Sequence, residues 1–166
     1  MRRLMLLACA LIALRPAAAH VTLDPVPAPV DSFVRLAVRV PHGCDGAATV
    51  APPHRLQVPH GLVSVRLMPK PGWTLGVVAG DAEEPGAAGH AAGPWPREIA
   101  WRGGPLSDDR FDEFLLMVRT PAAPGETLVV PFVQACEGGA VTRWIKRAGA
   151  GRPAPRWPAF LLMPKP

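Results

Sequence analysis

A histidine that directly follows a leader-like segment offers the most distinctive chemistry in this chain. The basic start Met1–Arg3 precedes an apolar run, Leu4–Leu14, and Ala17 and Ala19 form a small-residue cleavage motif just before His20. A basic start, a short apolar run and an A-x-A motif are typical of a secretory signal peptide. The run is too short to span a bilayer, which takes roughly 20 residues. We therefore expect residues 1–19 to be removed, so that His20 becomes the first residue of the mature chain.

An amino-terminal histidine supplies two nitrogen donors from one residue. The α-amino group of His20 and the Nδ1 atom of its imidazole can close a six-membered chelate ring on a metal ion. An ordinary α-amine has a pKa of about 7.7–8.0, so a strong Lewis acid can displace its proton. Nitrogen and oxygen donors in a tetragonal arrangement suit Cu(II). The alternative is that a histidine follows the cleavage motif by chance.

A glutamate within an apolar strand pattern is the strongest candidate for a further ligand. Alternation places Glu113 on one face with Leu115 and Met117, and Phe114 on the other face. We expect Glu113 to lie inside the protein among apolar neighbours, where an ionised carboxylate needs a partner. That partner is either a metal ion or an arginine in an ordinary salt bridge.

Two further side chains are candidates for the surroundings of a metal. Trp144 shares a face with Thr142 and Lys146, which predicts a large aromatic side chain on a polar face. It would lie either beside the metal or over the carboxy-terminal tail. His42 lies in a turn-rich segment close to Cys44 and is a candidate for an additional ligand. The alternative for His42 is an ordinary solvated loop histidine.

Two cysteines remain once Cys9 has left with the leader. An even pair in an exported chain predicts a disulfide between Cys44 and Cys136. Closing so long a loop stabilises a fold by roughly 4–5 kcal/mol in the chain-entropy model. A cysteine-based Cu(I) site is the alternative, but the sequence has no C-x-x-C motif.

Charge and motifs argue against several other classes of protein. The formal net charge is +5, but part of it belongs to the leader, and the remaining lysines and arginines are scattered. This distribution gives no nucleic-acid footprint and no polybasic membrane patch. No catalytic-triad arrangement of Ser, His and Asp stands out in the sequence, and it has neither a P-loop nor a dinucleotide-binding motif. We expect His54, His60 and His90 to lie in loops or turns without a role.

Period-2 alternation dominates the rest of the sequence and predicts strands separated by Pro- and Gly-rich turns. The 22 prolines argue against a helical fold. We expect residues 20–166 to form one all-β domain, an antiparallel β-sandwich of the immunoglobulin-like or cupredoxin-like type. Residues 80–96 are predicted to form a loop and residues 148–166 a Pro-rich tail. The predicted strands are 32–40, 55–58, 62–68, 73–78, 97–101, 111–119, 127–134 and 140–146, with 160–162 as a last strand in the tail.

Several short motifs, in order over most of the chain, carry a resemblance to a known family. The chain resembles the YcnI-like proteins, exported bacterial domains often encoded beside copper-handling genes. This chain is more similar to the family members that have two cysteines than to those that have none. The motifs are His20-Val21-Thr22-Leu23, Arg39-Val40-Pro41-His42-Gly43-Cys44-Asp45-Gly46, Pro59-His60-Gly61-Leu62-Val63, Pro69-Lys70-Pro71-Gly72-Trp73, Phe111-Asp112-Glu113-Phe114 and Gln134-Ala135-Cys136-Glu137-Gly138 with Trp144.

The resemblance implies a β-sandwich that binds Cu(II) through a monohistidine brace. In such a brace the amino-terminal histidine supplies amine and imidazole, a glutamate completes the set, and a tryptophan lies close to the metal. Carried over to this sequence, these residues are His20, Glu113 and Trp144.

Three functions follow as hypotheses. The first is a periplasmic, non-enzymatic Cu(II)-binding protein for copper trafficking and homeostasis, which exchanges copper with a membrane transporter or another periplasmic copper protein. The second is a non-catalytic interaction module of the cell envelope. The third is a copper-dependent oxidative enzyme. The enzyme is least favoured because such enzymes use a second brace histidine, and because a sequence without tyrosine excludes a tyrosine axial residue.

Overall fold

Almost all of the regular structure in this protein consists of β-strands, as the alternating pattern predicted. The structure is a computed structural model and describes residues 20–44, 53–62, 64–80, 95–145 and 158–164. The only helical element in this part of the chain is a single short 3-10 turn, Glu137–Gly139. Within the same residues, no helix is long and apolar enough to cross a membrane.

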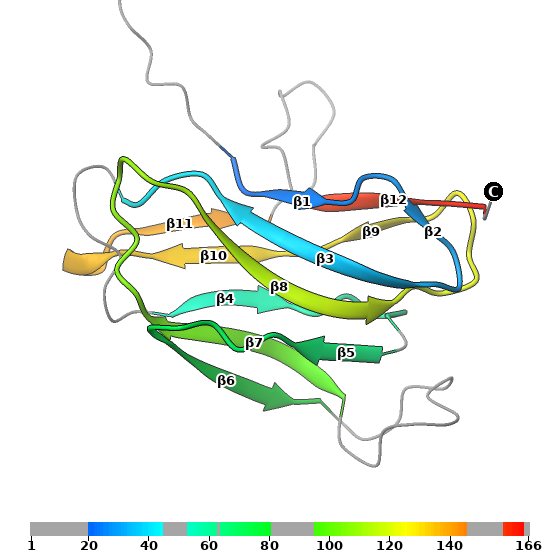
Figure 1. Ribbon diagram of the computed structural model, residues 1–166, viewed down its shortest axis with the longest axis horizontal. Helices are drawn as coiled ribbons and strands as arrows, with labels where there is room; N and C mark the ends of the chain where they lie inside the picture. The colour runs from blue at the N-terminus through cyan, green and yellow to red at the C-terminus, as the bar shows by residue number, and fades with distance from the viewer. Residues whose placement is uncertain (1–19, 45–52, 63, 81–94, 146–157, 165–166) are drawn as a thin grey trace, which may run out of the picture.

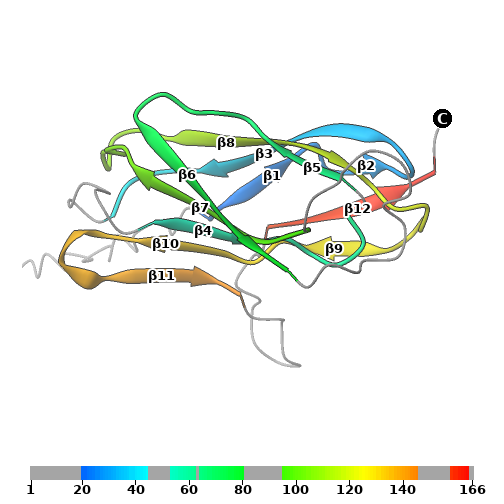
Figure 2. The ribbon, with the colours of Figure 1, turned by 90° about the horizontal axis from the view of Figure 1, so that it is seen from below.

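Two antiparallel sheets form the layers of a sandwich (Figures 1 and 2). The first sheet has the order β1-β3-β8-β5, with bounds Thr22–Asp24, Phe33–Val40, Asp112–Arg119 and Ser64–Leu67. The second sheet has the order β11-β10-β4-β7-β6, with bounds Val141–Trp144, Phe132–Ala135, His54–Gln57, Pro96–Gly103 and Trp73–Ala79. The strands β1 and β11 are edge strands along the same side of the sandwich (Figure 1).

A third, smaller sheet completes that side of the molecule and, among the residues that the structure describes, contains the one parallel strand pair. Its order is β2-β12-β9, with bounds Ala28–Pro29, Ala159–Met163 and Thr127–Val129. The strand β12 pairs parallel with β2 and antiparallel with β9. The predicted last strand in the Pro-rich tail is therefore confirmed. Residues 148–157 of that tail, and residues 81–94 of the loop predicted at 80–96, lie outside the described residues.

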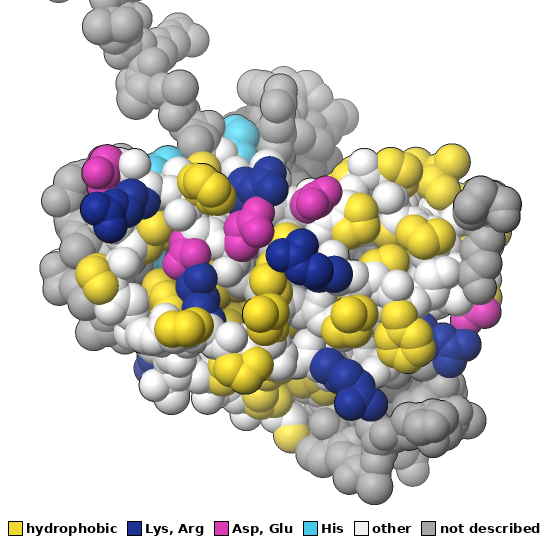
Figure 3. Space-filling model, viewed as in Figure 1, with side chains coloured by type: hydrophobic (Ala, Val, Ile, Leu, Met, Phe, Trp, Pro, Cys, Tyr) yellow, Lys and Arg dark blue, Asp and Glu magenta, His cyan; other side chains and the backbone are white. Residues whose placement is uncertain are grey.

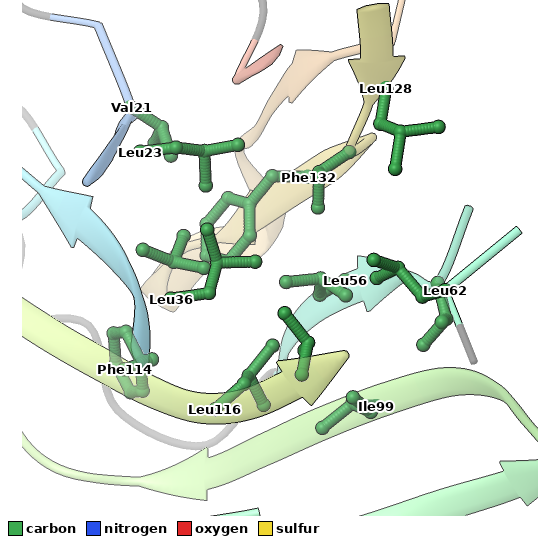
Figure 4. Packing of buried hydrophobic residues seen from close by; sticks show 14 of the residues in the cluster. Val21, Leu23, Leu36, Leu56, Leu62, Ile99, Phe114, Leu116, Leu128 and Phe132 are labelled. Atoms are coloured by element: carbon green, nitrogen blue, oxygen red, sulfur yellow. The ribbon is translucent and has the colours of Figure 1, made fainter. Parts of the chain in front are cut away.

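The core lies between the two large sheets and is built by alternation. In β8, Phe114, Leu116 and Val118 are buried, and they face buried residues such as Ile99 and Phe132 of the opposite sheet. Figure 4 shows side chains of both sheets pointing toward one another. Each fully buried aliphatic or aromatic side chain of this kind stabilises the fold by about 1.5–3 kcal/mol.

One predicted strand is wrong in its extent. Residues 127–134 were expected to form a single strand, but β9 ends at Val129 and β10 begins at Phe132. Pro131 lies between them and has no N–H to donate to a sheet, so the ladder is interrupted there. The two halves consequently pair with different sheets, β9 with β12 and β10 with β4 and β11.

A disulfide joins the two layers, as predicted from the cysteine pair. Cys44 lies just after β3 and Cys136 directly after β10, with their Cα atoms 5.8 Å apart and a sequence separation of 92. The Nε2 atom of Gln134 donates to the carbonyl oxygens of His42, at 3.0 Å, and Gly43, at 3.1 Å. The segment that follows β3 is thus fixed to the second sheet. Because both sulfurs are bridged, a cysteine-based Cu(I) site is excluded in this state.

Candidate metal centre

The strand that follows His20 holds this residue at the edge of the first sheet. Val21 and Leu23 are buried in the core, whereas Thr22 and Asp24 are exposed. This alternation anchors β1 and continues to His20, which is partly exposed and belongs to the same side as Thr22. His20 therefore lies on the solvent side of the sheet rather than in the core.

Strand pairing places Glu113 on that same solvent side. Thr22 lies opposite Arg39 in the β1–β3 pair, and Arg39 lies opposite Glu113 in the β3–β8 pair. These three residues form one row across the sheet, and with strands about 4.8 Å apart the row spans roughly 10 Å. His20 lies two residues before Thr22, at the end of the sheet where β8 begins. The fold thus brings two of the predicted ligands, far apart in sequence, to one end of one face.

Glu113 is not buried among apolar neighbours, which corrects the expectation from the sequence. Its side chain is 28% exposed, and the inner face of β8 at this point is occupied by Phe114. The Oε1 atom of Glu113 accepts hydrogen bonds from Arg39 Nε at 3.0 Å and Nη2 at 2.8 Å. Of the two partners considered for Glu113, the arginine in a salt bridge is therefore present. No donor within the described residues contacts Oε2, so this oxygen is open to an ion arriving from solvent.

A second ion pair fixes the backbone at the beginning of β8. Lys70 Nζ donates to Asp112 Oδ1 at 2.6 Å and to the carbonyl oxygen of Glu113 at 3.1 Å. The same Asp112 oxygen accepts the backbone N–H of Glu113 at 2.9 Å. Because Lys70 neutralises Asp112, the carboxylate of Glu113 is left with Arg39 as its counter-charge. The backbone that carries Glu113 is held in place, while its side chain stays at the surface.

Trp144 lies in the core and not on a polar face, which also corrects the expectation. It is 6% exposed and its ring centroid is 6.1 Å from that of Phe132. The preceding residues Val141, Thr142 and Arg143 are exposed, so β11 alternates poorly and shows its inward face only at its end. Trp144 belongs to the same core cluster as Val21, the residue that anchors His20.

His42 has protein partners of its own. Its Nδ1 atom is 2.8 Å from the carbonyl oxygen of Gly43 and 3.3 Å from Asp108 Oδ1. The side chain is about one-third exposed. His60, in the turn after β4, lines a surface hollow of about 440 Å³ that contains none of the predicted metal ligands. His90 lies outside the described residues.

His54 was expected in a loop, but it is the first residue of β4 and is fully buried. Its ring stacks on Trp73 at 5.2 Å and meets the edge of Phe114 at 5.2 Å. Neither ring nitrogen has a hydrogen-bond partner within the described residues. Burial lowers the pKa of His54 from 6.5 to about 4, with the charge of Asp112 acting in the opposite direction. The alternation of His54 with Leu56 is the signal in the sequence that could have placed it on the inner face.

His20 and Glu113 carry donor types that Cu(II) prefers, provided that cleavage after Ala19 frees the amino group of His20. In the parts of the chain that the structure describes, no three His, Cys, Asp or Glu side chains lie together in a way that could hold a metal ion. His20 can contribute two nitrogen donors and Glu113 one oxygen donor, which is the combination that suits Cu(II).

Comparison with protein families places the chain. Residues 20–163 match the model described as "Domain of unknown function (DUF1775)". The chain belongs to the DUF1775 family. The match to DUF1775 includes His20, His42, Glu113 and Trp144, together with both bridged cysteines. The family description assigns no activity to its members.

A solved structure supports the architecture of this DUF1775 domain. The crystal structure of an uncharacterized protein from Nocardia farcinica, described as revealing an immunoglobulin-like fold, is similar with a TM-score of 0.66. The two sequences are 24% identical, and the match covers 87% of this chain and 98% of that chain. This likeness shows the fold, and it confirms the immunoglobulin-like sandwich. No curated protein matches the chain.

Proposed function

We propose that this DUF1775 protein is exported, is cleaved after Ala19 and binds Cu(II) in the periplasm through His20. Within the family we place it with the YcnI-like proteins, on the motifs described above. The amine and imidazole of His20 form a monohistidine brace, and Glu113 supplies a carboxylate oxygen. Copper is the cargo of the protein, which serves trafficking and homeostasis rather than catalysis. It exchanges the ion with a membrane copper transporter or another periplasmic copper protein.

The observation that carries this proposal is the position of Glu113. This carboxylate faces solvent on the same side and at the same end of the sheet as His20, and one of its oxygens is not engaged by Arg39. The disulfide is in keeping with an oxidising compartment such as the periplasm.

Arg39 gives Glu113 a counter-charge that a metal ion can replace at low cost. The two side chains are 46% and 28% exposed. An exposed pair of this kind is typically worth about 0.2–1 kcal/mol, whereas chelation by two nitrogen donors and a carboxylate is far stronger. The guanidinium can move into solvent when the ion binds and return when it leaves. Trp144 acts on the site by packing in the core cluster that anchors β1.

The decisive test separates the amine from the imidazole. We expect His20→Ala to lose tight Cu(II) binding, and we expect the same of a variant with one alanine added ahead of His20, because the added residue displaces the α-amine. His60→Ala, in an exposed turn, is the matched control and should bind as the parent does. Affinity is measured by competition with a Cu(II) chelator, and unfolding temperature without metal checks the fold of each variant. Parental affinity in the extended variant would rule out the brace.

A further inference from the structure

The outer face of the first sheet carries an unusual number of large apolar side chains. Phe33 is 62% exposed, Met68 55% and Met117 41%. Soluble proteins rarely expose contiguous apolar patches of large size, and such patches commonly mark interaction sites. We define the outer patch as Phe33, Arg35, Arg66, Met68, Leu115 and Met117.

Strand register makes these residues neighbours. Met117 of β8 lies opposite Arg35 of β3 on one side and opposite Arg66 of β5 on the other. Beside them, the backbone N–H of Met68 donates to the carbonyl oxygen of Leu115 at 3.1 Å. Side chains that are opposite one another in a sheet lie about 4.5–5.5 Å apart at Cβ. Figure 3, in the view of Figure 1, shows hydrophobic side chains interleaved with basic ones over these strands.

The two arginines of the outer patch differ from the other cations on this face. Arg39 pairs with Glu113 and Arg119 pairs with Asp31, at 2.8 Å and 2.6 Å. The side chains of Arg35 and Arg66 are exposed and make no ion pair or hydrogen bond with any residue that the structure describes. A guanidinium presents a planar fork of donors that matches a carboxylate. The patch therefore offers two free carboxylate-binding groups on either side of an exposed methionine.

We propose that the outer patch docks an acidic segment of a partner protein, in which carboxylates flank an apolar side chain. Arginine and methionine are enriched in protein interfaces, and the partner's charges would meet Arg35 and Arg66 while its apolar side chain packs on Met117. A second copy of this chain does not fit as the partner, because the arginines of its own outer patch would repel Arg35 and Arg66. Two free arginines are also fewer than the roughly 4–8 basic residues that typically recruit a protein to anionic lipid.

The position of the outer patch suggests what docking achieves. Leu115 lies two residues after Glu113 on the same face of β8. A partner seated on the patch is therefore next to the candidate copper ligand. The inference that docking serves copper exchange rests on the proposed function, whereas docking itself does not depend on copper.

The test uses the copper-free chain from residue 20 onward and a synthetic peptide of repeated Glu-Leu-Glu units. Amide shifts in ¹⁵N-labelled protein should concentrate on β3, β5 and β8. We expect the double variant R35E/R66E to weaken binding by roughly tenfold or more, because two attractive pairs become repulsive. The matched control R102E/R143E makes the same charge change at exposed positions on the second sheet and should bind as the parent does. Met117→Gln should weaken binding without any change of charge.

Several outcomes would overturn the proposal. Unchanged peptide affinity in R35E/R66E, or an equal loss of peptide affinity in R102E/R143E, would show that the outer patch does not bind the peptide. Equal binding of a peptide with lysine in place of glutamate would show that carboxylates are not what the outer patch recognises. Binding to vesicles of phosphatidylcholine and phosphatidylglycerol that is lost in R35E/R66E, without peptide binding, would assign the face to a membrane. The chain with one alanine ahead of His20 should still bind the peptide, so failure of the copper site and failure of docking remain distinguishable.

Discussion

Glu113 and Arg39 meet in an exposed ion pair at the end of the first sheet where His20 also lies. The pair holds the carboxylate at the surface through Oε1 and leaves Oε2 unengaged by Arg39. Exposure makes the pair weak, since solvent screens it. A weak pair is what a reversible metal ligand needs, because its replacement by an ion costs little free energy.

This view of the pair predicts opposite effects for its two members. Glu113→Gln should weaken Cu(II) binding by roughly 10–100-fold, the usual size for losing a supporting group at a metal site. Arg39→Gln should leave Cu(II) affinity unchanged or raise it, because it removes a competing cation. Both affinities are measured by chelator competition. If Glu113→Gln binds Cu(II) as tightly as the parent, Glu113 serves only in the salt bridge.

Sequence reasoning found the partners available to Glu113 but not the face on which it lies. Alternation in β8 separates Glu113, Leu115 and Met117 from Phe114 and Leu116, and both sets contain large apolar residues. Local pattern cannot decide which set faces the core, because that depends on where the opposite sheet packs. Leu115 and Met117, whose apolar side chains led to the prediction that Glu113 faces the core, belong to the outer patch.

At the scale of elements, β4 begins with a histidine, His54, that is buried among aromatic side chains of the core. His54 is 0% exposed and its pKa is lowered to about 4 by burial. Well above pH 6.5 the residue is neutral in both the folded and the unfolded chain and has no effect on the pH dependence of stability. Between pH 6.5 and about 4, the unfolded chain binds a proton that the folded chain does not, so stability falls as the pH falls.

The loss of stability from His54 should reach roughly 3 kcal/mol at the acid end of this range. We expect His54→Leu to abolish this part of the pH dependence, because leucine cannot take up a proton in the unfolded state. His60→Leu is the control and should keep the parental slope. Urea unfolding of the metal-free chain between pH 7 and pH 4 gives the measurement. Equal slopes for the parent and His54→Leu would show that His54 is protonated in the folded state as well.

The predicted strands were mostly confirmed because alternation and turn residues are local signals. The short strands β1 and β2 were not predicted, since three or two residues carry too little pattern to be recognised. Trp144 was assigned to a polar face because its neighbours in β11 are polar, but an edge strand can expose most of its residues and still direct one into the core. These errors arise where long-range pairing outweighs local sequence.

At the scale of the whole molecule, the first sheet concentrates the features that bear on function. Its outer face carries the Glu113–Arg39 pair and the outer patch, and His20 stands at one end of it. The second sheet and the Cys44–Cys136 bridge support that face from behind. On the function and the docking proposed above, a single surface would bind the ion and receive the partner that exchanges it.

The central claim is that export creates the metal site by exposing the amine of His20. The most direct measurement is intact-mass analysis, under native conditions, of the full chain exported to a bacterial periplasm and given one equivalent of Cu(II). We predict a single species that begins at His20 and retains one copper ion. A chain that begins at another residue, or one that begins at His20 and retains no copper, would contradict the claim.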